Sequence, residues 1–194
     1  CANNTVTAGN WVHVESVHND DTDIDSIYIN GVLSNSATSR TTNPVTSANS
    51  FMIGGTSGFP GQLNGKMDNV MVYNYARTPS QVVQDMNGGH PSPGSPIGSA
   101  LAYYKFDEGT DNTCSGGTND VCNFGNGGNT LDGITGSMAA PGTSTSGWTN
   151  SGKFNKALRF DGTNDYVQVS DNNALDITGD FTLSAWVSRA GGTN

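Results

Sequence analysis

The segment from residue 156 to residue 169 constrains the fold most. Apolar and polar side chains alternate up to an Asp161-Gly162 pair and alternate again after it. Alternation with period two places side chains on opposite faces of an extended strand, and an Asp-Gly pair favours a tight turn. The segment therefore predicts a β-hairpin that carries two carboxylates, Asp161 and Asp165. These carboxylates either stabilise the turn or bind a cation.

Further regions show the short apolar or alternating patterns that are typical of strands. They comprise residues 11–17, 27–33, 51–55, 66–74, 101–109 and 181–187. The Asn30-Gly31 pair is the strongest short hairpin signal, because both turn residues need a positive φ. In the last region Trp186 lies on the face opposite to four alternating apolar residues. With 26 glycines in 194 residues, these patterns predict many short strands joined by turns.

One short helix is predicted near residues 79–86. Thr78 suits its N-cap and Pro79 its first position, while Gln81 stands three residues after Thr78 as a capping box requires. An Asn-Gly-Gly run at 87–89 ends the helix. The fold class is therefore all-β with a single short helix.

The charge balance limits the partners. Eight Lys and Arg face 17 Asp and Glu, which gives a formal net charge of -9. Such a surface repels a phosphate backbone, so we expect no nucleic-acid partner. The sequence also lacks an apolar run near the ~20 residues that a spanning helix needs, so this segment is not expected to cross a membrane.

Three cysteines indicate an oxidising compartment. Cys114 and Cys122 lie eight residues apart in a Gly- and Asn-rich region, and a small disulfide-closed loop is the simplest interpretation. A metal site would need further Cys or His residues nearby. Cys1 is left without a partner in this segment. These cysteines predict an extracellular or cell-surface location.

Two regions have little core material. Residues 89–99 are rich in Pro, Gly and Ser, which predicts a linker between domains. Residues 109–150 are mostly Gly, Thr, Ser and Asn, which predicts a long functional loop. The few candidates for burial in that loop are Leu131, Ile134 and Trp148.

Several motifs together resemble the laminin-G-like family, whose members are concanavalin A-like jelly-roll β-sandwiches. The segments that resemble the N-terminal half of such a domain are Ala102–Gly109, Gly152–Gly162, Asp165–Val167 and Asp180–Val187. Those that resemble its C-terminal half are Trp11–Val14, Ile27–Gly31, Ile53–Gly55, Gly65–Asn74 and the 78–86 helix. The resemblance implies an antiparallel jelly-roll sandwich.

The two halves occur in reversed order. Residues 1–88 resemble the C-terminal half, residues 89–99 form the linker, and residues 100–194 resemble the N-terminal half. Two arrangements stay open: a window of a longer tandem array that spans two successive sandwiches, or one permuted sandwich. Each half alone would have open sheet edges. We therefore expect neighbouring domains or subunits of the same kind to complete the sandwich.

The resemblance also implies a calcium site at the rim of the sandwich. Asp161 and Asp165 match the family pattern, and Asp68 with Asn69 stands where relatives carry an Asp-Glu pair. Carboxylate and carbonyl oxygens are the ligands that calcium requires, and Asn69 removes one charge from the set. Alternatively, Asp161 only forms the turn and Asp165 accepts backbone hydrogen bonds.

Catalysis is not expected. Glycosidases place two carboxylates across a cleft, whereas Asp107 and Glu108 are adjacent at a strand end, so that their side chains diverge. We therefore predict a non-catalytic extracellular adhesion or structural module, a component of a surface fibre or filament. The alternative is a calcium-dependent carbohydrate-binding module attached to a secreted enzyme. Glycans would then contact Trp148 and Tyr166, with Phe124 as a further rim aromatic.

Overall fold

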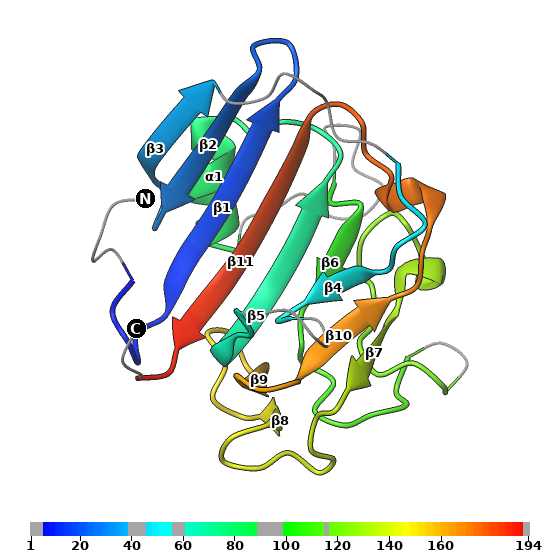
Figure 1. Ribbon diagram of the computed structural model, residues 1–194. Coiled ribbons are helices and arrows are strands. Elements are labelled where there is room, and N and C mark those ends of the chain that lie inside the picture. The colour runs from blue at the N-terminus through cyan, green and yellow to red at the C-terminus, as the bar shows by residue number, and fades with distance from the viewer. Residues whose placement is uncertain (1–5, 39–45, 56–60, 89–98, 115–116, 192–194) are drawn as a thin grey trace.

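The computed structural model describes residues 6–38, 46–55, 61–88, 99–114 and 117–191, and these residues form two facing antiparallel sheets (Figure 1). The large sheet has eight strands. Their order is β3 (Val32–Thr38), β2 (Ile24–Ile29), β1 (Val12–Asn19), β11 (Phe181–Arg189), β5 (Asn64–Tyr73), β9 (Ala157–Asp161) and β8 (Gly147–Thr149), with β6 (Ala102–Tyr104) also paired to β5. The small sheet has three strands, in the order β4 (Phe51–Ile53), β10 (Tyr166–Val169) and β7 (Gly133–Gly136).

Among the described residues, helical structure is limited to short pieces. One α-helix, α1 (Pro79–Met86), packs on the outer face of the large sheet, and two 3-10 turns are η1 (Asn129–Leu131) and η2 (Asn173–Leu175). The predicted capping box is present, since the Thr78 hydroxyl accepts from the backbone N–H of Gln81 and the Gln81 side chain accepts from Thr78 N–H. The prediction of an antiparallel β-sandwich with one short helix is confirmed.

The main core lies between the two sheets. Leu158 and Phe160 of β9 are fully buried there, and so are Val167 and Val169 of β10. Gly54 lets the Phe160 ring approach the end of β4, because a Cβ at that position would lie 2.1 Å from the ring. The alternation in these segments therefore does mark core-facing residues.

The hairpin predicted for residues 156–169 is wrong. β9 pairs with β5 and β8 in the large sheet, whereas β10 pairs with β4 and β7 in the small sheet. The Asp-Gly segment between them is an arch that crosses from one layer to the other, with Gly162 at φ 81°. Both strands direct their apolar side chains into the same core, so they face each other rather than share backbone hydrogen bonds.

Strands from the two predicted halves combine in both sheets. β1 pairs with β11, and β5 pairs with β6, β9 and β11. Complementary halves of successive repeats would pair in the same way as the halves of one permuted domain. The choice between these arrangements stays a prediction, and most of the predicted linker at 89–99 lies outside the described residues.

The stretch from 109 to 150 contains more structure than its composition predicts. It holds η1, β7 and β8, the last of which forms one edge of the large sheet. Leu131 and Trp148 are buried as expected, but Ile134 is 49% exposed. The Ile134 expectation is wrong because Ile134 lies on the outward side of β7, between the buried Gly133 and the half-buried Thr135.

Candidate functional site

The two carboxylates of the arch hold its backbone together. The Asp161 N–H donates to Asp165 Oδ2 at 2.9 Å, and Asp161 Oδ1 accepts from Thr163 N–H at 2.7 Å. Asp165 is 1% exposed, and burial raises its pKa. Both side chains therefore have the structural role that the sequence offers as the alternative to calcium binding.

The other two residues of the predicted calcium set lie elsewhere on the large sheet. Asn64 is the residue opposite Asp161, so Asp68 stands four residues further along β5, roughly 13 Å at strand spacing. Asp68 Oδ2 accepts from Phe154 N–H at 2.8 Å, and burial raises the pKa of Asp68 to about 7. The four residues thus do not form one ligand set. Calcium at the arch alone stays a prediction.

Asn69 has a conformational role. Its φ is 50°, and the pairing of β5 with β11 shifts register beside it, which marks a β-bulge. Asn tolerates this left-handed conformation better than Glu does. The Tyr103 hydroxyl donates to Asn69 Oδ1 at 2.9 Å, where β5 changes partner from β9 to β6. The bulge explains an Asn inside a strand.

The predicted ligand-binding aromatics differ in accessibility. Trp148 is 8% exposed, and its indole N–H donates to Asp111 Oδ1 at 2.8 Å. The structure therefore places Trp148 in the core rather than on a ligand-binding surface. Tyr166 is half-buried, and its ring packs over Gly136. Phe124 is 40% exposed and lies 4.4 Å from Lys105 Nζ.

The predicted disulfide joins Cys114 to Cys122. Glu108 lies beside it and accepts from Cys122 N–H at 3.1 Å, and burial raises the Glu108 pKa. Together with Glu108 these cysteines make up the one group of three metal-type ligands within the described ranges. Because both sulfurs are in the disulfide, the group is not a metal site.

A polar cluster is buried on the outer face of the large sheet, beneath α1. Arg77 donates to both carboxylate oxygens of Asp85, at 2.8 and 2.5 Å, and Tyr73 donates to Asp85 Oδ1 at 2.9 Å. On the same face, His13 Nε2 lies 2.9 Å from Ser184 Oγ and 3.7 Å from a Glu15 carboxylate oxygen. The sequence predicts His13 on a strand face but not its burial under a helix.

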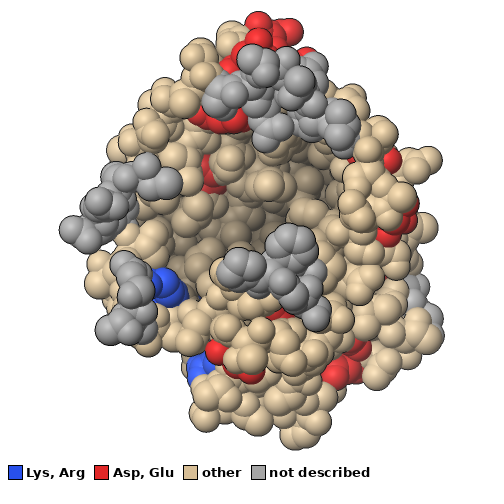
Figure 2. Space-filling model, viewed as in Figure 1, with Lys and Arg blue, Asp and Glu red and all other residues tan. Residues whose placement is uncertain are grey.

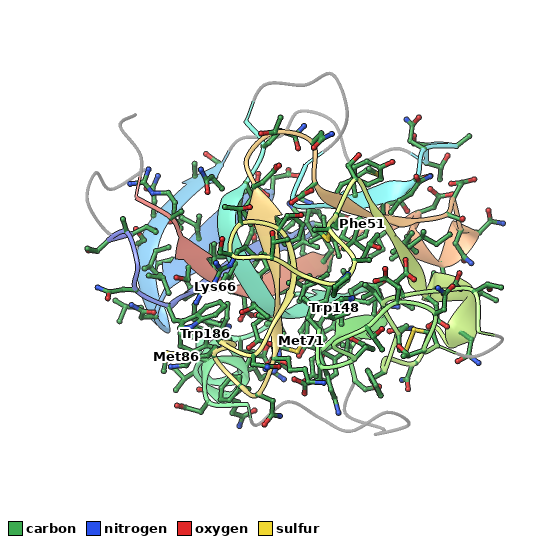
Figure 3. The ribbon with its side chains drawn as sticks, turned by 90° about the horizontal axis from the view of Figure 1, so that it is seen from below. Phe51, Lys66, Met71, Met86, Trp148 and Trp186 are labelled. Carbon is green, nitrogen blue, oxygen red and sulfur yellow. A yellow bond between two sulfur atoms is a disulfide. The ribbon has the colours of Figure 1, made fainter. Side chains whose placement is uncertain are left out.

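Within the part of the chain that the structure describes, the opposite face of the large sheet is only partly covered. A cavity of ≈ 360 Å³ lies between β4 and strands β1, β11 and β5, and we call it the apolar hollow. Figure 2 shows this face hollowed in the middle with a largely uncharged floor. Its lining includes Val14, Met52, Met67, Leu183, Ala185 and Val187. Figure 3 shows Phe51 on the hollow's side of the sheet and Met86 and Trp186 on the side of α1.

The composition of β11 reflects these two environments. On the side of the sheet that carries α1, the buried residues of β11 are Thr182, Ser184 and Trp186. Leu183, which is 39% exposed, faces the hollow on the other side. The more apolar face of this strand is therefore the less buried one. An apolar sheet face with this exposure marks a surface where another protein segment can pack.

Comparison with known proteins agrees with the fold. Residues 1–83 match the family model described as the concanavalin A-like lectin/glucanases superfamily, Laminin_G_3. The matched part is the one whose motifs resemble the C-terminal half of a laminin-G-like domain. No curated protein and no solved structure gives a match. Among the described helices none is long and apolar enough to cross a membrane.

Proposed function

We propose that this chain is a non-catalytic extracellular adhesion or assembly module. The observation that supports the proposal is the apolar hollow, where the described residues leave strands β1, β11 and β5 without a complete facing layer. At ~4.8 Å between strands, the seven-strand path of the large sheet spans roughly 29 Å and the small sheet roughly 10 Å. Additional strands beside β4 would cover the remaining apolar surface.

The edge of β4 offers a way to add them. Within the described ranges, the small sheet ends at β4, whose other edge pairs with β10. All three β4 residues line the hollow, so a strand added there would gain backbone hydrogen bonds and bury apolar side chains together. We propose that strands of a second copy, or of a neighbouring domain of the same kind, occupy this place.

Other features support a secreted module without catalysis. The Cys114–Cys122 disulfide is typical of oxidising compartments. Asp107 accepts from Lys156 N–H at 2.9 Å, and Glu108 from Cys122 N–H, so both carboxylates fix loops.

Self-association tests the proposal. Leu183→Lys places a charge in the hollow, whereas Val32→Lys, at a 69% exposed site outside it, is the control. We expect the parent chain to associate with rising concentration in sedimentation velocity, and Leu183→Lys to weaken association more than about tenfold because a buried charge is costly. A parent chain that stays monomeric at high micromolar concentration, or equal association of both variants, would contradict it.

Calcium-dependent carbohydrate binding is the second candidate, favoured by the lectins named in the matched family. Its test is thermal melting with calcium and with chelator. If calcium binds at the arch, the melting temperature of the parent rises with calcium and that of an Asp161→Ala, Asp165→Ala variant does not. Equal calcium responses of the two proteins would exclude the arch as the site.

A further inference from the structure

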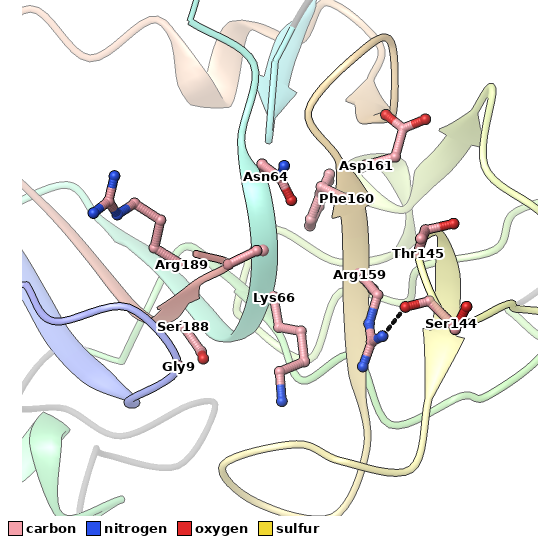
Figure 4. A pocket seen from close by; sticks show the side chains of 12 residues that line it. Gly9, Asn64, Lys66, Ser144, Thr145, Arg159, Phe160, Asp161, Ser188 and Arg189 are labelled. Carbon is pink, nitrogen blue, oxygen red and sulfur yellow. Dashed lines mark hydrogen bonds between the residues drawn. The ribbon is translucent and has the colours of Figure 1, made fainter. Parts of the chain in front are cut away.

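Cations gather at one cavity of this acidic protein. Three of its eight Lys and Arg residues, Lys66, Arg159 and Arg189, line a cavity of ≈ 340 Å³ at the end of the large sheet (Figure 4). Since the chain carries a net charge of -9, this concentration runs against its overall balance. The cavity is within the range of volumes that ligand sites occupy.

Strand register places two of these cations side by side. Lys66 of β5 is directly opposite Arg159 of β9. Their neighbours Met67 and Leu158 pack with the core, so Lys66 and Arg159 extend from the outer face, and Figure 4 shows both side chains pointing the same way. Like charges in directly opposite positions destabilise a sheet. Burial and the Arg159 charge lower the Lys66 pKa, so the pair costs stability without a ligand.

Neither cation has a carboxylate partner among the ion pairs of the described residues. Lys66 Nζ donates to the Ser151 carbonyl at 3.1 Å, and Arg159 Nη1 donates to the Ser144 carbonyl. The Arg159 Nε atom is buried with no hydrogen-bond partner in the described part of the chain. An unsatisfied buried donor is costly. An oxyanion is the acceptor that a guanidinium favours, and it would contact the accessible part of the half-buried Arg159 side chain.

The lining also contains one carboxylate, Asp161, which accepts from Thr163 N–H, and three hydroxyl groups that suit a hydroxylated ligand. Ser144, Thr145 and Ser188 place hydroxyl groups on the cavity, which can donate to and accept from sugar hydroxyls. The half-buried Trp11 ring lies 5.0 Å from Lys66 Nζ and adds an aromatic surface beside the cations. Cations, hydroxyls and an aromatic ring together match an acidic sugar.

We propose that this cavity binds the carboxylate or sulfate group of an acidic polysaccharide, with Lys66 and Arg159 holding the oxyanion. The shared chemistry is a saccharide oxyanion, whether a uronate or a sulfate ester. The site lies on the outer face of the large sheet and the apolar hollow on the inner face, so it is independent of the assembly proposal.

Calorimetric titration tests the site with four probes: an oligogalacturonate, a heparin oligosaccharide, a neutral cello-oligosaccharide and inorganic sulfate. We expect one or both acidic oligosaccharides to bind the parent chain, more weakly as salt rises, and the stronger of the two identifies carboxylate or sulfate. The Lys66→Met, Arg159→Gln variant should lose at least about tenfold in affinity. Lys105→Met, a cation outside the cavity, should bind like the parent.

Several outcomes would overturn the proposal. They are an absence of binding by both acidic oligosaccharides, equal binding of the neutral one, equal affinity in the double variant, or inorganic sulfate binding as tightly as the oligosaccharides. Melting curves would show that the double variant is folded, because both side chains are only half-buried. Leu183→Lys should keep the affinity, which separates this result from the assembly test.

Discussion

Replacing Asp85 with alanine is expected to lower the free energy of unfolding by about 3–5 kcal/mol, the cost of breaking a buried ion pair from one side. Asp85 is 1% exposed and Arg77 is 3% exposed. The carboxylate accepts two hydrogen bonds from the guanidinium and one from Tyr73, and the guanidinium lies 4.5 Å from the Tyr73 ring. Without Asp85, the Arg77 guanidinium and the Tyr73 hydroxyl would stay buried between α1 and the large sheet and would lack the carboxylate to which they donate.

A double variant separates charge from packing. Arg77→Met with Asp85→Leu removes both charges and keeps apolar volume, so it should regain most of the stability that Asp85→Ala loses. Asp21→Ala, at an exposed turn position, is the control for loss of a carboxylate. Urea unfolding measures all three. If Asp85→Ala lowers the free energy of unfolding by less than about 1 kcal/mol, the Arg77–Asp85 pair contributes no more than an exposed salt bridge does, and its structural role is refuted.

Local signals in the sequence predict local structure well. The start of α1 follows from Thr78 and Pro79, because capping and the fixed φ of proline act within one helical turn. The Asn30-Gly31 turn has φ values of 49° and 77°, as a hairpin between two twisted strands requires. The disulfide joins the only two cysteines that lie close in sequence. In each case the deciding interactions span fewer than about ten residues.

Long-range pairing could not be predicted in the same way. Alternation identifies β9 and β10, but their partners come from strands far away in sequence, so the arch resembles a hairpin. The juxtaposition of Lys66 with Arg159 depends on the register of β5 against β9. Asn69 carries the one signal that could have been used: an Asn within an apolar strand is typical of a left-handed bulge residue.

The buried acid Glu15 gives the second large effect, on the pH dependence of stability. Burial raises its pKa from 4.5 to about 8, and the nearby Asp85 carboxylate adds to the shift. Between these values the folded protein binds a proton that the unfolded chain releases. Stability from Glu15 is therefore complete below about pH 4.5 and falls by about 1.4 kcal/mol per pH unit until the pH passes about 8.

Two other buried groups decide where this effect is visible. Burial lowers the pKa of His13 from 6.5 to about 4, so its contribution rises with pH over that interval and opposes that of Glu15. Asp68, with a pKa of about 7, acts in the same direction as Glu15 but only up to that pH. Between about pH 4.5 and 6.5 the changes in stability that come from His13 and from Glu15 largely cancel. Between about pH 7 and 8 the change in stability comes mainly from Glu15.

Glu15→Gln keeps the shape of the protonated acid and removes its titration. We expect urea unfolding of the parent to show a loss of stability between about pH 6.5 and 8, and the variant to be nearly flat above about pH 7. Asp68→Asn is the matched comparison: it should flatten the profile only below about pH 7. Parallel pH profiles for the parent and Glu15→Gln would mean that Glu15 is ionised in the folded protein. The outer face beneath α1 would then have to hold a second buried charge beside Asp85, at an energetic cost that only a further cation or solvent access could offset.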